Sequence, residues 1–191
     1  MIKLIDLSKQ YDGKAVLDNV TVDFPPNGFI AICGPSGCGK TTLLNIIAQL
    51  TKPDNGKVIF GIAKPIVSMS FQEPRLLAGR TAAENVNLVM GDKKATLPRA
   101  EELLSELGIS DASLYPDELS GGMKARVSIA RALALKADIY LFDEPFANLD
   151  RETSLLCAGA IKRKTAGALT VAVIHDTDLA EKVADRVIFI K

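Results

Sequence analysis

The sequence contains few cysteines and no excess of charge of either sign. Its cysteines are Cys33, Cys38 and Cys157. Their odd number and their spacing fit neither a disulfide framework nor a zinc site, which predicts free thiols in a reducing compartment. The 23 basic and 23 acidic residues give a formal net charge of +0. That balance argues against non-specific binding to nucleic acid or to anionic membranes as the main activity.

Long apolar runs, internal repeats and low-complexity tracts are also missing. No stretch approaches the run of about 20 apolar residues that a membrane-spanning helix needs. The first residues, Met1 to Asp6, lack the apolar centre and the cleavage site of a signal peptide. With 48% apolar residues in a chain of 191, we expect one globular domain over residues 1–191.

What the sequence does contain is an alternation of apolar runs with helical patterns. The continuous runs are typical of strands buried on both faces, and they occupy residues 29–33, 139–142 and 169–174. A helical pattern follows each run, over residues 43–50, 151–165 and 176–184. This alternation predicts an α/β fold with a parallel sheet that is covered on both faces. Helical patterns dominate between about Glu73 and Leu135, which predicts a core lobe (1–72 and 136–191) with an inserted helical subdomain (73–135).

The segment after the first continuous run reads Gly-Pro-Ser-Gly-Cys-Gly-Lys-Thr-Thr and matches the P-loop pattern from Gly34 to Thr41. Its glycines let backbone N–H groups turn inward, and these donors bind phosphate together with the start of the next helix. Lys40 would reach the β- and γ-phosphates, and the Thr41 hydroxyl would ligate Mg²⁺. The alternative is a glycine-rich turn with a surface lysine; the flanking strand and helix favour a P-loop. The predicted nucleotide-binding residues are Gly34, Pro35, Ser36, Gly37, Cys38, Gly39, Lys40, Thr41 and Thr42.

Polar residues end three further apolar strands. Asp143 and Glu144 follow residues 139–142, at the sheet edge where ligands of such folds bind. Asp143 would support Mg²⁺ through water, and Glu144 would orient or deprotonate the attacking water. His175 also ends an apolar strand at the sheet edge, where it could contact the γ-phosphate. Gln72 ends another, and its amide could ligate Mg²⁺ or hold the attacking water. Taken singly, each of these residues could also be a solvated strand end.

The stretch Leu119-Ser120-Gly121-Gly122-Met123 resembles the signature motif of the ABC ATPases. The P-loop, Gln72, Asp143-Glu144, Asn148-Leu149-Asp150 and His175 accompany it in the order typical of that family, across essentially the whole chain. The sequence is therefore identified as a member of this family. The resemblance implies a P-loop NTPase fold: a RecA-like parallel-sheet core with antiparallel β strands and an inserted α-helical subdomain.

The resemblance also implies roles for single residues. It makes Glu144 the catalytic base and His175 the switch histidine, assisted by Lys40 and Gln72, while Thr41, Gln72 and Asp143 hold the metal. Tyr11 matches the aromatic residue that stacks on adenine. Ser120, Gly121 and Gly122 would contact the γ-phosphate of ATP bound to a partner subunit, and Asp150 belongs to the D-loop that joins the two sites.

The family resemblance further implies ATP and Mg²⁺ as cofactors and a homodimer that forms on ATP binding. Hydrolysis would power a transmembrane permease that docks near Gln72–Leu77, in a system with a solute-binding protein and without nucleic acid. The expected location is cytoplasmic, peripheral on the inner face of the cell membrane. The motifs are most similar to importer ATPases of the nitrate/sulfonate/taurine type. The alternatives are an exporter or lipoprotein-release ATPase, a non-transport ABC ATPase, or a regulatory module without turnover.

Some positions depart from the family pattern. Gln49 stands where a glycine usually ends the helix after the P-loop, and Met123 replaces the commoner glutamine. Ala78-Gly79 replaces a bulkier pair at the expected permease surface. Because the chain ends at Lys191, soon after the last expected strand, we expect no regulatory domain.

Overall fold

The structure is a computed structural model that describes residues 1–91 and 93–190. It contains a five-stranded parallel sheet of order β5-β6-β7-β3-β8 and a three-stranded antiparallel sheet of order β2-β1-β4. The parallel strands are β3 (Gly28–Cys33), β5 (Val67–Ser70), β6 (Ile139–Asp143), β7 (Leu169–Val173) and β8 (Arg186–Phe189). The antiparallel strands are β1 (Ile2–Tyr11), β2 (Lys14–Phe24) and β4 (Asn55–Phe60).

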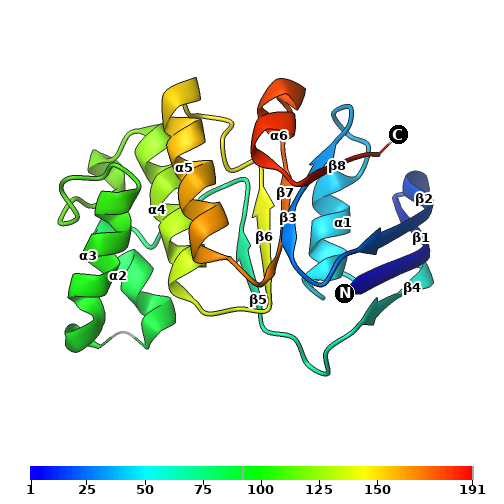
Figure 1. Cartoon of the computed structure of the whole chain (residues 1–191), viewed down its shortest axis with the longest axis horizontal. Coiled ribbons are helices and arrows are strands. Elements are labelled where there is room, and N and C mark those ends of the chain that lie inside the picture. Colours follow the sequence, from blue (N-terminus) through cyan, green and yellow to red (C-terminus); the bar gives the residue numbers. More distant parts are fainter. Residues whose placement is uncertain (92, 191) are drawn as a thin grey trace.

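Helices flank the parallel sheet, as the alternating pattern predicts (Figure 1). They are α1 (Lys40–Ile47), α2 (Ala82–Asn87), α3 (Leu97–Glu106), α4 (Gly121–Ala134), α5 (Arg151–Lys164) and α6 (Thr177–Val183), with short 3₁₀ helices at Leu88–Met90, Lys94–Thr96 and Pro116–Glu118. Figure 1 shows α2, α3 and α4 gathered at the end of the molecule away from the antiparallel sheet. The division into a core lobe and a helical subdomain stays a prediction. No described helix has the length and apolar character needed to cross a bilayer.

The core consists of two clusters, one on each face of the parallel sheet. Side chains alternate along β3: Phe29 and Ala31 join the cluster with α2 to α6, whereas Ile30 and Ile32 join the cluster with α1 and the antiparallel sheet. Both faces of β3 are therefore buried, which explains why its sequence is continuously apolar. The same alternation along β6 and β7 fixes the register, and with it the sheet edge at which Asp143 and the polar residues that follow the two strands lie.

The helix after the P-loop is shorter than its apolar spacing indicates. The pattern extends to Leu50, but α1 ends at Ile47. Gln49 adopts a left-handed conformation with φ 60°. Its N–H donates to the Ile46 carbonyl at 3.0 Å, and the Leu50 N–H donates to the Asn45 carbonyl at 2.9 Å. These two bonds form a Schellman motif, which ends a helix and favours glycine at the left-handed position.

Candidate active site

The P-loop turns sharply between β3 and α1. Gly39 has φ +89°, and a Cβ there would lie 2.5 Å from the Val16 carbonyl oxygen, so only glycine fits. Lys40 follows at the start of α1 and is only 5% exposed. Its Nζ donates to the Gly34 carbonyl at 2.9 Å and to the Pro35 carbonyl at 2.7 Å, with Cys38 Sγ at 3.8 Å. The lysine ammonium is thus held inside the loop by the loop's own carbonyls.

Thr41 and Asp143 meet beneath the P-loop. The Thr41 hydroxyl donates to Asp143 Oδ1 at 3.2 Å, and Asp143 is only 2% exposed at the end of β6. Burial raises the pKa of the Asp143 carboxyl, and the nearby Glu144 carboxylate adds to the rise, whereas the hydrogen bond from Thr41 and the Lys40 ammonium lower it. The fold therefore brings two of the three predicted metal ligands together from positions 102 residues apart.

Glu144 occupies a strained position directly after β6. Its φ of 50° lies in the left-handed region, which costs a non-glycine residue about 1 to 2 kcal/mol. Both carboxylate oxygens have partners: Oε1 lies 2.6 Å from His175 Nε2, and Oε2 accepts from Gln72 Nε2 at 3.3 Å. Gln72 and His175, which follow β5 and β7, thus both contact the carboxylate of Glu144, which follows β6. The positions of these residues after parallel strands predict this.

A hollow of about 350 Å³ lies between the P-loop and these strand ends. Nine of the predicted site residues line this hollow, and so does Val16, which sequence reasoning missed. Its lining residues are Val16, Ser36, Gly37, Gly39, Lys40, Thr41, Thr42, Gln72, Glu144 and His175.

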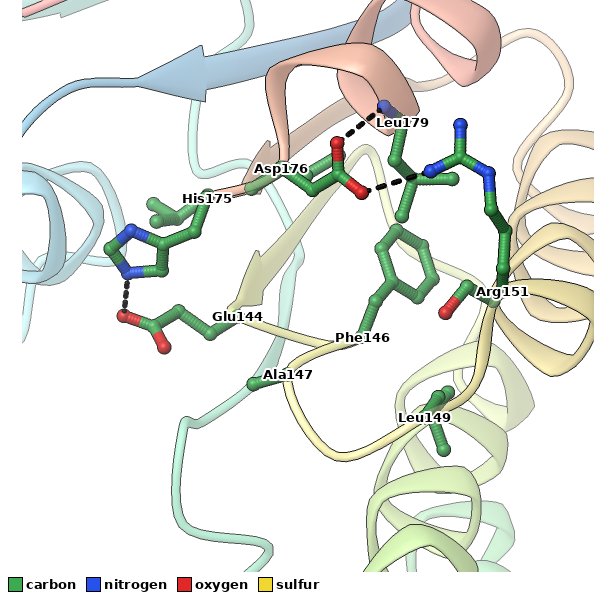
Figure 2. Close-up of a pocket in the computed structure, with 11 residues that line it drawn as sticks. Glu144, Phe146, Ala147, Leu149, Arg151, His175, Asp176 and Leu179 are labelled. Carbon is green, nitrogen blue, oxygen red and sulfur yellow. Dashed lines mark hydrogen bonds and ion pairs between the residues drawn. The ribbon is translucent and has the colours of Figure 1, made fainter.

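A second hollow, of about 370 Å³, lies on the other side of Glu144 and His175 (Figure 2). It is bounded by Phe146, Leu149 and Leu179 and by an ion pair in which Arg151 Nη1 lies 3.0 Å from Asp176 Oδ2. Sequence reasoning singled out neither member of this pair. Asp176 carried a usable signal, because an acidic residue just before a helix is a preferred N-cap, and its Oδ1 accepts from the Leu179 N–H at 3.0 Å.

Other predicted site residues lie outside the P-loop hollow. Tyr11, 46% exposed at the end of β1, has the Lys9 Nζ 5.4 Å from its ring centroid and is not among the described residues that line the hollow. Ser120 is the N-cap of α4 and accepts from the Met123 N–H at 3.2 Å, as its place before the helical pattern predicts. Asp150 caps α5 in the same way, and its bonds from Thr153 lower the pKa of its carboxyl.

Comparison with known proteins agrees with this fold and site. A family model described as ABC transporter matches residues 17–147. The arginine transport ATP-binding protein ArtM of Bacillus subtilis (strain 168) is 36% identical to the chain, over 99% of this chain and 87% of its own. The aliphatic sulfonates import ATP-binding protein SsuB of Delftia acidovorans is 37% identical, over 100% and 79%.

Solved structures agree as well. The dimeric structure of MJ0796, a bacterial ABC transporter cassette, superposes with a TM-score of 0.90 and 32% identity over 100% of this chain and 94% of that chain. The predicted P-loop NTPase fold is therefore confirmed, as is the similarity to sulfonate-type importer ATPases. The chain belongs to the ABC transporter family and is one of its ATP-binding ATPases.

Proposed function

We propose that this chain binds ATP and Mg²⁺ in the P-loop hollow and that its hydrolysis of ATP drives a separate membrane permease in the uptake of a small solute. One observation carries the chemical part: a single hollow contains Lys40, Thr41, Gln72, Glu144 and His175. A relative named for the import of aliphatic sulfonates supports the direction of transport.

ATP binding at the P-loop would exchange the hydrogen-bond acceptors of Lys40. The β- and γ-phosphates take the place of the Gly34 and Pro35 carbonyls as the acceptors of the Lys40 ammonium. The first N–H groups of α1 have no partner within the helix and point toward the same phosphates. Tyr11 would stack on the adenine after a movement toward the hollow.

The donor set fits Mg²⁺. The Thr41 hydroxyl and the Asp143 carboxylate lie 3.2 Å apart and are hard oxygen ligands, and the Gln72 amide oxygen can supply a third. Among the described residues no group of three or more histidines, cysteines and acidic residues could hold a metal by itself, and phosphate oxygens and water would supply the remaining ligands. When bound, the ion would neutralise charge on the β- and γ-phosphates.

Glu144 is placed to act as the general base. Its carboxylate lies at the hollow's wall, where a water that attacks the γ-phosphate can donate a proton to it. His175 and Gln72 orient that carboxylate, each at one oxygen. His175 can turn from Glu144 to the γ-phosphate once ATP is present, which would free one oxygen for the water.

The hollow would be one half of a composite site that a second chain completes. Ser120, Gly121 and Gly122 are not among the described residues that line the hollow of their own chain. A Cβ at Gly121 would meet nothing within 4 Å, so the chain's own packing gives no reason for glycine there. Close approach of a molecule from outside explains it, and the start of α4 suits an anion such as the ATP of a second chain.

A mixing experiment tests the composite site. Lys40→Ala should abolish ATP binding in its own hollow, and Gly121→Asp should repel the partner's phosphates without a clash inside the chain. Each variant alone should be inactive. An equal mixture should recover about a quarter of the wild-type rate, since half of the dimers are mixed and each has one intact site. Full activity of Gly121→Asp alone, or no recovery in the mixture, would contradict the proposal.

The permease would dock near Gln72–Leu77, where Leu77 is an exposed apolar side chain, and a solute-binding protein would deliver the solute. This places the chain at the cytoplasmic face of the membrane. Stimulation of its ATPase activity by the permease in vesicles, and by solute with binding protein, tests the assignment. Transport in the outward direction would identify the exporter alternative instead.

A further inference from the structure

We propose that Arg131 is a positioning residue for Gln72, acting through the two backbone carbonyls of Pro74 and Arg75. The inference rests on the proposed role of Gln72 in hydrolysis. Arg131 lies in the last turn of α4 and is not among the described residues that line the P-loop hollow, and nothing in the motif pattern singles it out.

The contact is a two-point clamp. Arg131 Nη1 donates to the Arg75 carbonyl at 2.9 Å, and Nη2 donates to the Pro74 carbonyl at 2.6 Å. A guanidinium is planar, so two donors on successive carbonyls fix the orientation of the peptide between them as well as its distance. A lysine at this position would supply a point charge and lose that orientation.

The turn that carries Gln72 depends on such a clamp. Arg75 has φ 48°, a left-handed conformation that a non-glycine residue keeps only where its surroundings hold it. The Arg75 side chain folds back, with its Cζ 4.0 Å from the centroid of the Phe71 ring, and closes the turn around Gln72. Gln72 itself is exposed and makes its hydrogen bond to Glu144 at 3.3 Å. Its side chain is therefore placed by the backbone of the turn more than by packing.

The helix that carries Arg131 is itself fixed to the strand that leads to Gln72. Ser128 Oγ lies 2.9 Å from Ser70 Oγ, and Ser68 Oγ donates to the Ala132 carbonyl at 2.8 Å, both bonds buried. The turn after β5 is thus held from the same helix on both sides of Gln72. Since Ser120 caps the other end of this helix, a shift of α4 at its start would be transmitted to the turn through Arg131.

A matched control exists on the same helix. Arg126 Nη1 also donates to two backbone carbonyls, of Leu107 at 3.0 Å and Gly108 at 2.8 Å, but these lie at the end of α3. Arg131→Met and Arg126→Met therefore remove comparable bonds, and both should lower the melting temperature. Hydrogen exchange in wild type and both variants separates them: Arg131→Met should speed exchange of the backbone amides in residues 72–76 other than Pro74, which has none, and Arg126→Met should leave those amides unchanged.

The kinetic test is a double-mutant cycle with Gln72→Ala. We expect Arg131→Met to lower kcat about tenfold with ATP affinity unchanged, and to add no loss in the Gln72→Ala background. Arg131→Lys should restore only a small part of kcat. Arg126→Met should change kcat by the same factor in the wild-type and Gln72→Ala backgrounds. A loss from Arg131→Met that multiplies with that of Gln72→Ala, or unchanged exchange at 72–76, would overturn the inference alone. A Gln72→Ala variant with wild-type kcat would overturn the proposed role of Gln72 and the inference with it.

Discussion

His175 Nε2 lies 2.6 Å from Glu144 Oε1, and this one contact forms the wall that the P-loop hollow and the hollow beside Arg151 share (Figure 2). Glu144 comes directly after β6 and His175 comes two residues after the end of β7; both strands are buried and pair in parallel register. The contact occupies the oxygen of Glu144 that faces His175, so in the chain without nucleotide the carboxylate is already engaged. An attacking water must therefore compete with His175 at Oε1 or with Gln72 at Oε2.

Glu144→Gln tests the assignment of the base. The amide keeps the size of the side chain and cannot accept a proton, so ATP binding should persist while hydrolysis falls at least about a hundredfold. Steady-state hydrolysis and size-exclusion chromatography with ATP measure the two effects, and the variant should accumulate as a dimer. Glu73→Gln, at an exposed carboxylate that follows Gln72 in the chain, is the control. Wild-type turnover in Glu144→Gln would show that another group takes the proton.

The three cysteines should differ in reactivity. Cys33 and Cys157 are fully buried, and burial raises the pKa of both thiols, that of Cys157 to about 11. Cys38 is partly exposed in the P-loop, 3.8 Å from the Lys40 ammonium. Because the thiolate is the reactive form, a maleimide at pH 7 should modify Cys38 alone. Mass spectrometry of the native protein checks this, and Mg-ATP should protect; equal labelling of Cys157 would contradict the burial argument.

Gln49→Gly should stabilise the protein. Gln49 holds the left-handed position of the Schellman motif after α1, where a side chain is strained and glycine is not. The gain should be about 0.5 to 1 kcal/mol in the free energy of unfolding, reduced by the greater freedom of glycine in the unfolded chain. Denaturant unfolding measures it. Gln49→Ala keeps a Cβ and should bring no gain; an equal gain from alanine would refute the conformational explanation.

Asp185 predicts a dependence of stability on pH. The ion pair with Lys162, at 2.7 Å, and the bond from the Phe29 N–H, at 2.8 Å, lower the pKa of the Asp185 carboxyl. A lowered folded-state pKa contributes stability above the ordinary value and loses it as the pH falls through the folded value. Asp185→Asn should therefore cost about 1 kcal/mol at pH 7, because the pair is half exposed, and the difference from wild type should shrink below about pH 4.

Lys162→Met provides the partner control for this pair. In the Lys162→Met background, Asp185→Asn should have a smaller effect at pH 7, and the pH dependence of that effect should move toward the ordinary carboxyl range. Unfolding curves between pH 3 and pH 7 measure both differences. An effect of Asp185→Asn that stays constant over this range would mean that the carboxylate charge contributes nothing.

The sequence predicted those parts of the site that are local in the chain. The P-loop lies within nine residues, and its glycines, lysine and threonine each have a fixed function in a strand-turn-helix. The convergence of Gln72, Glu144 and His175 followed from a general property of parallel sheets, since the carboxyl ends of the strands share an edge. Helix α2 was not singled out, because six residues show too little periodicity; its capping box at Thr81 and Glu84 was the usable signal.

Contacts between distant residues could not be predicted in this way. Arg131 reaches carbonyls 56 and 57 positions away, and a backbone carbonyl leaves no mark in the sequence. The fully buried Asn85 is similar: its side-chain Nδ2 donates to the carbonyls of Leu77, Arg80 and Thr81. Such polar groups are specified by three-dimensional placement, whereas apolar periodicity reports only which face of an element is buried.

The two carbonyls that hold Lys40 bear on how fast the nucleotide site fills. A buried ammonium without hydrogen-bond partners is unfavourable, so the loop would distort or open until the ammonium reached water. The chain would then have to order the loop when nucleotide binds. The carbonyls of Gly34 and Pro35 fix the Lys40 ammonium within the loop, so ordering this side chain should cost little entropy when phosphate takes their place. Association should therefore approach the diffusional range, and differences in affinity between nucleotides should appear mainly in their rates of release.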